Sequence, residues 1–266
     1  MKVRVETVTA NDITAGYVHF GTEGRQPLVI LPGLSIKSVL GSAQAIGRAY
    51  GIFEKDYEVY LFDRRNEMPE KYEIRDMAED TVKIMKALKL EKVDLFGVSM
   101  GGMIAQVIAI EYPEMVRHLV LGSTTSRIDA SRQEMFDEWI SYAEKKDGRG
   151  LSEAFGSLVY SPDFYEKYKD IIINSSADAS EEDFRRFITC AQGTVGFDVY
   201  DRLTEIKCPV LVLAAGKDMV LGVQASKDIA ERAHGKLYVY EEYGHAAYDE
   251  APDYKERIYR FLAEKD

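Results

Sequence analysis

A serine stands between glycines in the stretch GVSMGG, residues 97–102. The preceding VDLF is short and apolar, as in a buried strand, and the following MIAQVIAIEY has apolar residues at helical spacing. This pattern predicts that Ser99 lies in a sharp strand-to-helix turn, with Gly97 and Gly101 beside it because such a turn leaves little room for side chains. A G-x-S-x-G turn holds the serine hydroxyl exposed above the sheet, as a nucleophile requires. The alternative is a tight turn in which the serine only caps the helix.

A serine hydroxyl needs a base within hydrogen-bond reach before it can act as a nucleophile. The chain has four histidines, and His245, in YGHAAY, directly follows the last predicted strand. It therefore belongs to the same carboxyl edge of the sheet as Ser99, where ligands of open parallel sheets gather. His19 and His118 lie in or just before predicted strands, and His234 ends a helix. We predict His245 as the general base; the alternative is a surface loop histidine.

The base in turn needs a carboxylate to orient its ring and to stabilise the imidazolium. Asp218, in AAGKDMV, follows the strand VLVLAAG and so also lies at a carboxyl strand end. The alternative is that Asp218 only turns the loop or caps the next helix. Asp63, in YLFDRRN, also follows a predicted strand and is the rival acid, although its neighbours Arg64 and Arg65 favour ion pairing and loop structure instead. The order serine, aspartate, histidine along the chain is the one expected of this architecture.

An oxyanion hole requires two backbone N–H groups aimed at one point. The amide of Met100 is the first candidate, because it opens a helix whose dipole favours negative charge. The second is the amide of Leu34, in the loop after PLVILPG, where Gly33 lets the chain turn close to the site. The alternative for PGLS is a plain turn that ends the strand.

Strands and helices alternate over the first half of the chain and again near its end. Continuous apolar or alternating runs predict strands at 3–8, 16–20, 27–33, 57–63, 93–97, 117–123, 208–216 and 236–242. Helical spacing predicts helices at 43–52, 73–88, 103–112, 224–233 and from 252 onward. This order predicts an α/β protein with a mostly parallel twisted sheet and helices on both faces.

The alternation breaks between residues 124 and 205, where amphipathic helical stretches replace buried strands. One of them, SEEDFRRFITCAQ, begins with a capping serine, Ser180. We predict a core formed by 1–123 and 206–266 and a helical cap insertion at 124–205. Most of its many aromatic side chains are expected to form the insertion's own core. A few are expected to line a pocket, with Trp139 and Tyr160 as candidate substrate contacts.

The composition is that of a soluble globular protein: 266 residues, 46% hydrophobic and 30% charged, with a net charge of −11. An acidic balance excludes a general nucleic-acid or anionic-membrane surface. The chain has no membrane-spanning run and no secretory signal, so we expect a cytoplasmic protein. Cys190 and Cys208 lack metal-ligand spacing; free thiols are expected, and a disulfide between them is the alternative. The oligomeric state is left open.

The four motifs together resemble the α/β-hydrolase superfamily over nearly the whole chain. LVILPGLS is similar to its oxyanion strand and loop, and DLFGVSMGGMIAQVIAIEYPEMVRHLVL to its nucleophile turn and following strand. IKCPVLVLAAGKDMV is similar to its acid strand and YGHAAYDEAP to its histidine loop. The resemblance implies the α/β-hydrolase fold with a helical cap insertion. Members commonly carry His-Gly where Pro32-Gly33 stands and a proline at the position of Gly222.

The S-M-G-G turn and helical insertion resemble small-molecule esterases, enol-lactonases, carbon–carbon hydrolases and cofactor-free perhydrolases. A serine nucleophile sets the chain apart from the dehalogenase and epoxide hydrolase branches. We expect a serine hydrolase that cleaves a small ester, thioester or lactone and needs no metal or organic cofactor. Carbon–carbon hydrolysis and perhydrolysis by the same triad are the enzymatic alternatives. The others are a small-molecule receptor that keeps the hydrolase site and an inactive scaffold, although no triad member is missing.

Overall fold

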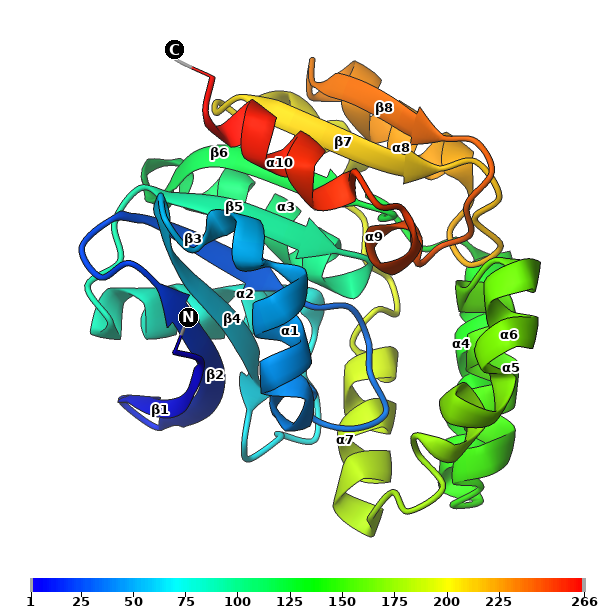
Figure 1. Cartoon of the computed structure of the whole chain (residues 1–266). Helices are drawn as coiled ribbons and strands as arrows, with labels where there is room; N and C mark the ends of the chain where they lie inside the picture. Colours follow the sequence, from blue (N-terminus) through cyan, green and yellow to red (C-terminus); the bar gives the residue numbers. More distant parts are fainter. Residues whose placement is uncertain (1, 265–266) are drawn as a thin grey trace.

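A single eight-stranded sheet organises the molecule in the computed structural model, which describes residues 2–264 (Figure 1). Its spatial order is β1-β2-β4-β3-β5-β6-β7-β8. The strands β1 and β2 pair antiparallel, β2 also runs antiparallel to β4, and all other neighbours are parallel. The strands are β1 (Arg4–Ala10), β2 (Ile13–Gly21), β3 (Gln26–Leu31), β4 (Tyr57–Arg65), β5 (Val93–Val98), β6 (Val116–Gly122), β7 (Val210–Ala215) and β8 (Lys236–Tyr240). The predicted mostly parallel sheet is confirmed.

Helices cover both faces of this sheet, which explains the continuous apolar runs of its central strands. In β3, Val29 and Leu31 join the core on one face, while Leu28 and Ile30 join the core on the other. The first face carries α2 (Ile74–Ala87), α3 (Met100–Glu111) and α8 (Val223–Arg232). The second carries α1 (Ala43–Ala49) and α10 (Tyr254–Leu262). The predicted α/β-hydrolase architecture with helices on both faces is confirmed.

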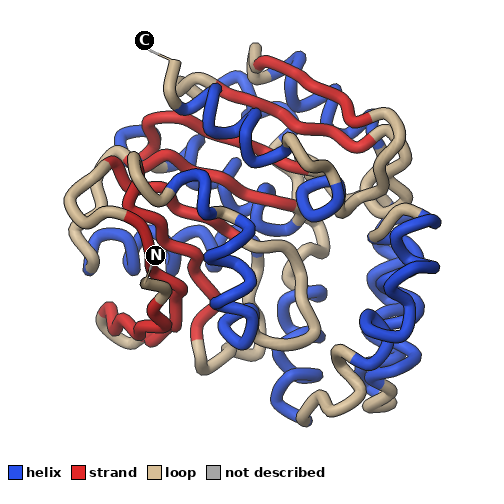
Figure 2. Tube along the Cα trace, in the orientation of Figure 1, coloured by secondary structure: helices blue, strands red, loops and turns tan. Residues whose placement is uncertain are grey.

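Four helices occupy the chain between β6 and β7. They are α4 (Ala130–Glu144), α5 (Gly148–Val159), α6 (Pro162–Asn174) and α7 (Glu181–Gln192). Ser180 caps α7 as predicted, since its hydroxyl accepts the Asp183 amide at 3.1 Å and the Asp183 side chain bonds back to Ser180. Helix α4 packs against α5 and α7. Figure 1 shows these helices beyond the carboxyl ends of the strands, and Figure 2 shows tan loops between the strands and these helices.

The two ends of this helical segment are held together by backbone hydrogen bonds. The amide of Ile128 donates to the carbonyl of Phe197 at 2.9 Å. The amide of Val199 donates to the carbonyl of Ser126 at 2.8 Å. The chain therefore leaves β6 and returns toward β7 through one short pair of adjacent segments. The division into a core and a cap, at the predicted boundaries 124 and 205, stays a prediction.

Both cysteines are free thiols, Cys190 on α7 and Cys208 shortly before β7. Burial raises the pKa of the Cys190 thiol, and burial raises the pKa of Cys208 to about 11. Within residues 2–264, no group of three or more histidine, cysteine, aspartate or glutamate side chains is arranged to hold a metal ion. None of the helices in that range is both long enough and apolar enough to cross a membrane.

Candidate active site

Ser99 occupies the turn between β5 and α3 with a backbone angle φ of +54°, a conformation that L-residues rarely adopt. Its amide donates to the carbonyl of Gly122 on β6 at 2.9 Å, which ties the turn to the sheet. A Cβ on Gly97 would lie 2.3 Å from the Gly101 carbonyl oxygen. A Cβ on Gly101 would lie 2.0 Å from the carbonyl oxygen of Leu31. Glycine on either side of Ser99 is thus a steric requirement of this turn.

His245 and Asp218 form a buried pair at the carboxyl ends of β7 and β8. His245 Nδ1 lies 2.9 Å from one Asp218 carboxylate oxygen and 3.0 Å from the other. The Asp218 Oδ1 oxygen also accepts the amides of Val220 and Leu221 at 2.8 and 2.9 Å. Burial raises the pKa of Asp218, but the charge of His245 and these hydrogen bonds outweigh it, so the pKa is lowered. Asp218 therefore stays ionised and fixes the imidazole ring.

The oxyanion loop, defined here as residues 32–35 after β3, packs directly on the serine turn. A Cβ on Gly33 would lie 3.0 Å from Ser99 Cβ and 3.5 Å from Ser99 Oγ. The register that pairs Leu31 with Gly97 brings the loop to this place. The amides of Leu34 and Met100 have no acceptor among residues 2–264, so both are available to an external oxygen.

Ser99 and His245 are brought to the same edge of the sheet without being hydrogen-bonded to each other in the described part of the chain. The base is 2% exposed and is held by Asp218 alone among the described side chains. Hydrogen bonds between a nucleophile and its base are often long or poorly aligned until a substrate is bound. Ser99, His245 and Asp218 thus follow strands at the same edge of the sheet, and their action as a catalytic triad stays a prediction.

A family model described as "alpha/beta hydrolase fold" matches residues 26–252. The chain belongs to the α/β-hydrolase fold family. The predicted resemblance is confirmed, and the comparisons assign this α/β-hydrolase to the hydrolytic enzymes.

Three proteins illustrate the similarity. The 3-oxoadipate enol-lactonase 2 of Acinetobacter baylyi is 25% identical over 245 residues, which cover 89% of this chain and 88% of that protein. MGS-M2, an α/β-hydrolase enzyme from a Medee basin deep-sea metagenome library, superposes with a TM-score of 0.88 at 21% identity and 98% coverage of both chains. The enol-lactonase of Burkholderia xenovorans LB400 superposes with a TM-score of 0.83 at 19% identity, covering 97% of this chain and all of that one. The two structures share the fold.

Asp63, the rival acid, is not hydrogen-bonded to His245 among the described residues, and it lies within β4 and not after the strand as predicted, because β4 continues to Arg65. Its carboxylate accepts the Ser38 hydroxyl at 2.5 Å and the Arg64 amide at 2.8 Å. It also lies 3.4 Å from the guanidinium of Arg186 on α7. The ion pairing anticipated from the sequence is therefore present, but its partner comes from the distant helix α7 instead of from Arg64 or Arg65.

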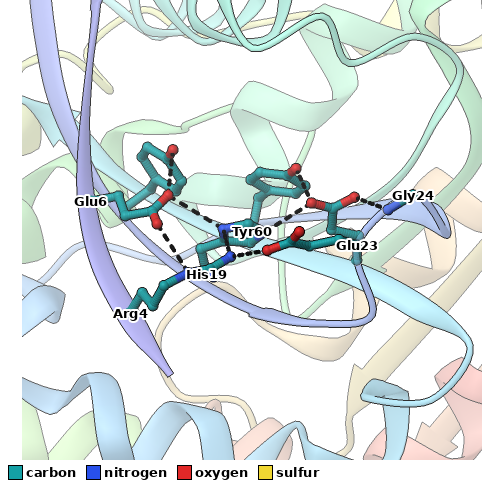
Figure 3. Close-up of polar contacts among 8 residues, drawn as sticks. Arg4, Glu6, His19, Glu23, Gly24 and Tyr60 are labelled. Atoms are coloured by element: carbon teal, nitrogen blue, oxygen red, sulfur yellow. Dashed lines mark hydrogen bonds and ion pairs between the residues drawn. The ribbon is translucent and has the colours of Figure 1, made fainter. Parts of the chain in front are cut away.

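His19 belongs to a polar network on β1, β2 and β4 rather than to the site (Figure 3). Its Nδ1 atom lies 2.9 Å from Arg4 Nη2, and its Nε2 atom lies 2.9 Å from a carboxylate oxygen of Glu58. The ring stacks on Tyr60, with the centroids 4.6 Å apart. Both ring nitrogens contact side chains of neighbouring strands. These contacts explain why the histidine is buried without assigning it a catalytic role.

The other two histidines also have positions that explain them structurally. His118 is 2% exposed, and its Nδ1 atom lies 2.9 Å from the carboxylate of Asp94. His234 follows α8 with a φ of +51°, at the turn that ends the helix. Of the four histidines, His245 is the one whose carboxylate partner follows a carboxyl strand end of the sheet.

The two aromatic residues proposed for substrate contact lie at different depths. Trp139 is 1% exposed, and its ring lies 5.4 Å from that of Phe136 and 4.8 Å from that of Phe155. It is a core residue of the insertion helices. Tyr160, half-buried after α5, stacks on Phe164 with the centroids 5.0 Å apart. Burial raises the pKa of the Tyr160 phenol to about 12, so its hydroxyl is neutral. A substrate role for either side chain stays a prediction.

A small cavity beside the oxyanion loop is lined in part by residues that the sequence did not predict as site residues. Its lining includes the loop, Met100 of the serine turn, Arg64 from β4, and Arg186 and Cys190 from α7. The place of Arg186 in the cavity could not be predicted, because its position in an amphipathic helix does not reveal which part of the core the helix contacts. The pair Arg64-Arg65 after Asp63 is visible in the sequence, but the sequence does not indicate that Arg64 lines a cavity.

Proposed function

We propose that this α/β-hydrolase is a serine hydrolase that cleaves a small ester, thioester or lactone through an acyl-enzyme on Ser99. The observation that carries the proposal is the packing of Gly33 on Ser99, because it puts the loop that contains the Leu34 amide against the turn that contains Ser99 and the Met100 amide. The buried pair of Asp218 and His245 at the same sheet edge supports it, since a serine requires a base oriented by an acid.

The reaction proceeds in two halves. Ser99 Oγ attacks the substrate carbonyl while His245 Nε2 takes the hydroxyl proton, and Asp218 stabilises the resulting imidazolium. The amides of Leu34 and Met100 bind the oxyanion, and His245 returns the proton to the departing alcohol, thiol or enol. The acyl-enzyme is then hydrolysed by water that His245 activates in the same way. Every proton is carried by this chain's own groups, so no metal or organic cofactor enters the scheme.

The similarity to an enol-lactonase supports a small carbonyl compound as the substrate. An enol-lactonase that is 25% identical over most of both chains carries out ring opening of a lactone, as its name states. We propose that α4–α7 act as a cap over the site and select such a substrate. The left-handed backbone conformation of Ser99 and the burial of Asp218 are costs that a merely structural turn would not require, which favours a reactive serine over a capping one.

The test is hydrolysis of p-nitrophenyl acetate and butyrate by the wild type and by Ser99→Ala, both checked for folding by circular dichroism. We expect the variant to lose up to ~10⁶-fold in turnover. A fluorophosphonate probe, which reacts with activated serines, should add its mass to the peptide that contains Ser99 in the wild type alone. Equal turnover by the two proteins would remove Ser99 from the mechanism. A folded wild type inert toward esters, thioesters and lactones would overturn the proposal.

A further inference from the structure

The cavity beside the oxyanion loop has cationic walls in a chain whose net charge is −11. Three of its lining residues are basic, Lys37, Arg64 and Arg186, and one, Asp63, is acidic. Lys37 is paired outside the cavity with Asp178 at 2.9 Å. The charge balance inside the cavity is therefore set by two arginines and one carboxylate.

Arg64 is the unusual member of this group. The residue is 8% exposed, yet no carboxylate oxygen within residues 2–264 lies within 4.0 Å of its guanidinium. Its Nη2 atom donates to the carbonyl of Pro32 at 2.7 Å. Its Nε atom is buried and has no hydrogen-bond partner in the described structure. A buried cationic donor without an acceptor is costly, and a carboxylate is the acceptor that arginine geometry fits best.

Asp63 is fully used by other partners. It accepts the Ser38 hydroxyl and the Arg64 amide, and it lies 3.4 Å from Arg186 Nη2. Arg186 Nη1 also donates to the carbonyl of Arg65 at 2.9 Å, so this side chain joins α7 to the end of β4. Asp63 thus balances the charge of Arg186, and the positive charge of Arg64 is left over beside the oxyanion loop.

We propose that this cavity is a subsite for a free carboxylate group of the substrate, with Arg64 as its main contact and Arg186 as the second. The inference rests on the proposed function and narrows it: the preferred substrates are esters or lactones that carry a second, anionic carboxylate. The cavity has a volume of about 20 Å³, room for about one water-sized group, so it accommodates one oxygen of a carboxylate. It touches Gly33, Leu34 and Met100, so the carboxylate lies close to the carbonyl under attack.

The test compares two substrates with the same six-carbon acyl chain, the p-nitrophenyl monoester of adipic acid and p-nitrophenyl hexanoate. We expect the wild type to prefer the charged ester by about 10- to 100-fold in kcat/KM, the range of one charge-assisted hydrogen bond in a desolvated site. Arg64→Gln should lower this ratio by at least about tenfold. Because Arg64 also holds the oxyanion loop, the ratio of the two substrates is the readout, and not the rate with either one.

The matched control is Arg185→Gln. Arg185 precedes Arg186 on α7, is 70% exposed and pairs with Glu182 at the surface. This variant removes the same charge from the same helix and should keep the wild-type ratio. Arg186→Gln is the second test variant and should also lower the ratio, which keeps the proposal testable if Arg64→Gln does not fold. A wild type that cleaves both esters equally well overturns the subsite and leaves the proposed function standing.

If the wild type cleaves neither of these two esters, the proposed function is judged by the acetate, butyrate, thioester and lactone substrates, and the subsite is judged by binding. Sodium adipate is then titrated against the wild type and Arg64→Gln while the melting temperature is followed, with sodium chloride at equal ionic strength as the reference. A rise in the melting temperature that adipate causes in the wild type but not in Arg64→Gln supports the subsite. The absence of a rise in the wild type, or an equal rise in both proteins, overturns it.

Discussion

The hydroxyl of Ser161, at the junction of α5 and α6, donates a hydrogen bond to the carboxylate of Glu250, in the short helix α9 (Ala247–Glu250) that follows His245. The amide of Ser161 donates to the same carboxylate at 2.9 Å. Beside it, the amide of Ala246 donates to the carbonyl of Val159 at 2.8 Å. The insertion helices are therefore attached to the chain immediately after His245, and the position of His245 depends on them.

Ser161→Ala should lower both stability and turnover. The substitution removes a hydrogen bond to a charged group and leaves the amide bond in place, so we expect a loss of about 1 to 3 kcal/mol in the free energy of unfolding, measured in urea. Because Glu250 follows His245 closely, kcat for p-nitrophenyl acetate should fall as well. Ser157→Ala is the control, since the exposed Ser157 hydroxyl bonds only to the Ala154 carbonyl within its own helix. Identical behaviour of the two variants would argue against the attachment.

Asp218→Asn should reduce kcat by about 10⁴-fold, because an amide favours the wrong tautomer of the histidine it contacts. The comparison variant is Asp63→Asn, the rival acid, which lies near the carboxyl end of β4. Its carboxylate contacts Ser38 and Arg186 and not His245, so we expect a smaller loss. Steady-state kinetics with p-nitrophenyl acetate measures both. The acid would have to be reassigned if Asp63→Asn showed the larger loss.

The stability that Asp218 contributes should depend on pH in a defined direction. Its pKa in the folded protein lies below the ordinary value, so protons bind more tightly to the unfolded chain. The contribution is complete above the unfolded pKa of about 4 and is lost as the pH falls through the folded value. The difference in unfolding free energy between the wild type and Asp218→Asn should therefore stay constant above about pH 5 and shrink as the pH falls below about 4. Urea unfolding at several pH values checks it, and a constant difference would contradict the assignment.

Gly101→Ala should prevent the serine turn from closing. The new methyl group would lie 2.0 Å from the carbonyl oxygen of Leu31, a backbone atom that cannot rotate away. We expect a loss of more than about 3 kcal/mol, or an insoluble protein. Gly51→Ala is the control, because a Cβ at Gly51 meets nothing within 4 Å. Thermal unfolding compares them, and a normal melting temperature for Gly101→Ala would mean that the turn has a different geometry.

His19→Ala should reduce stability without changing kcat/KM. The ring contacts Arg4 and Glu58 and stacks on Tyr60, so its removal breaks two hydrogen bonds to charged groups and one ring stack at a cost of about 1 to 3 kcal/mol. The ring has no part in the proposed reaction. His245→Ala provides the opposite pattern, a loss of turnover, and the pair of variants separates structural from catalytic histidines. A loss of activity in folded His19→Ala would count against this division.

The fold was predictable because its signals are local. Each of these elements is indicated by its own residues: the apolar runs of β3 and β7 predict strands, and the glycine-serine stretch before α3 predicts a turn. The order of such elements predicts an α/β sheet. Helix α9 was not predicted, because it spans only Ala247–Glu250 and is too short to show a period. Its hydrogen bond to Ser161 gives it a role that periodicity does not reveal.

The site was predictable in part for the same reason. Asp218 and His245 both follow strands, so the sheet topology alone brings them together, and the structure places them within 3.0 Å. Arg186 was not predictable, because helical spacing reports which side of α7 is buried and not what lies opposite. Its approach to Asp63 is decided by how α7 packs on the end of β4, a long-range property of the whole chain.

The backbone bonds that join Ile128 to Phe197 and Ser126 to Val199 bring the two ends of the helical segment together. The neighbouring strands β6 and β7 pair with each other independently of that segment, so its exchange leaves the sheet intact. A replacement segment must, however, supply its own contacts to the chain after His245, because Val159 and Ser161 make them here. For a protein engineer, the same two bonds mark where a foreign segment should be spliced.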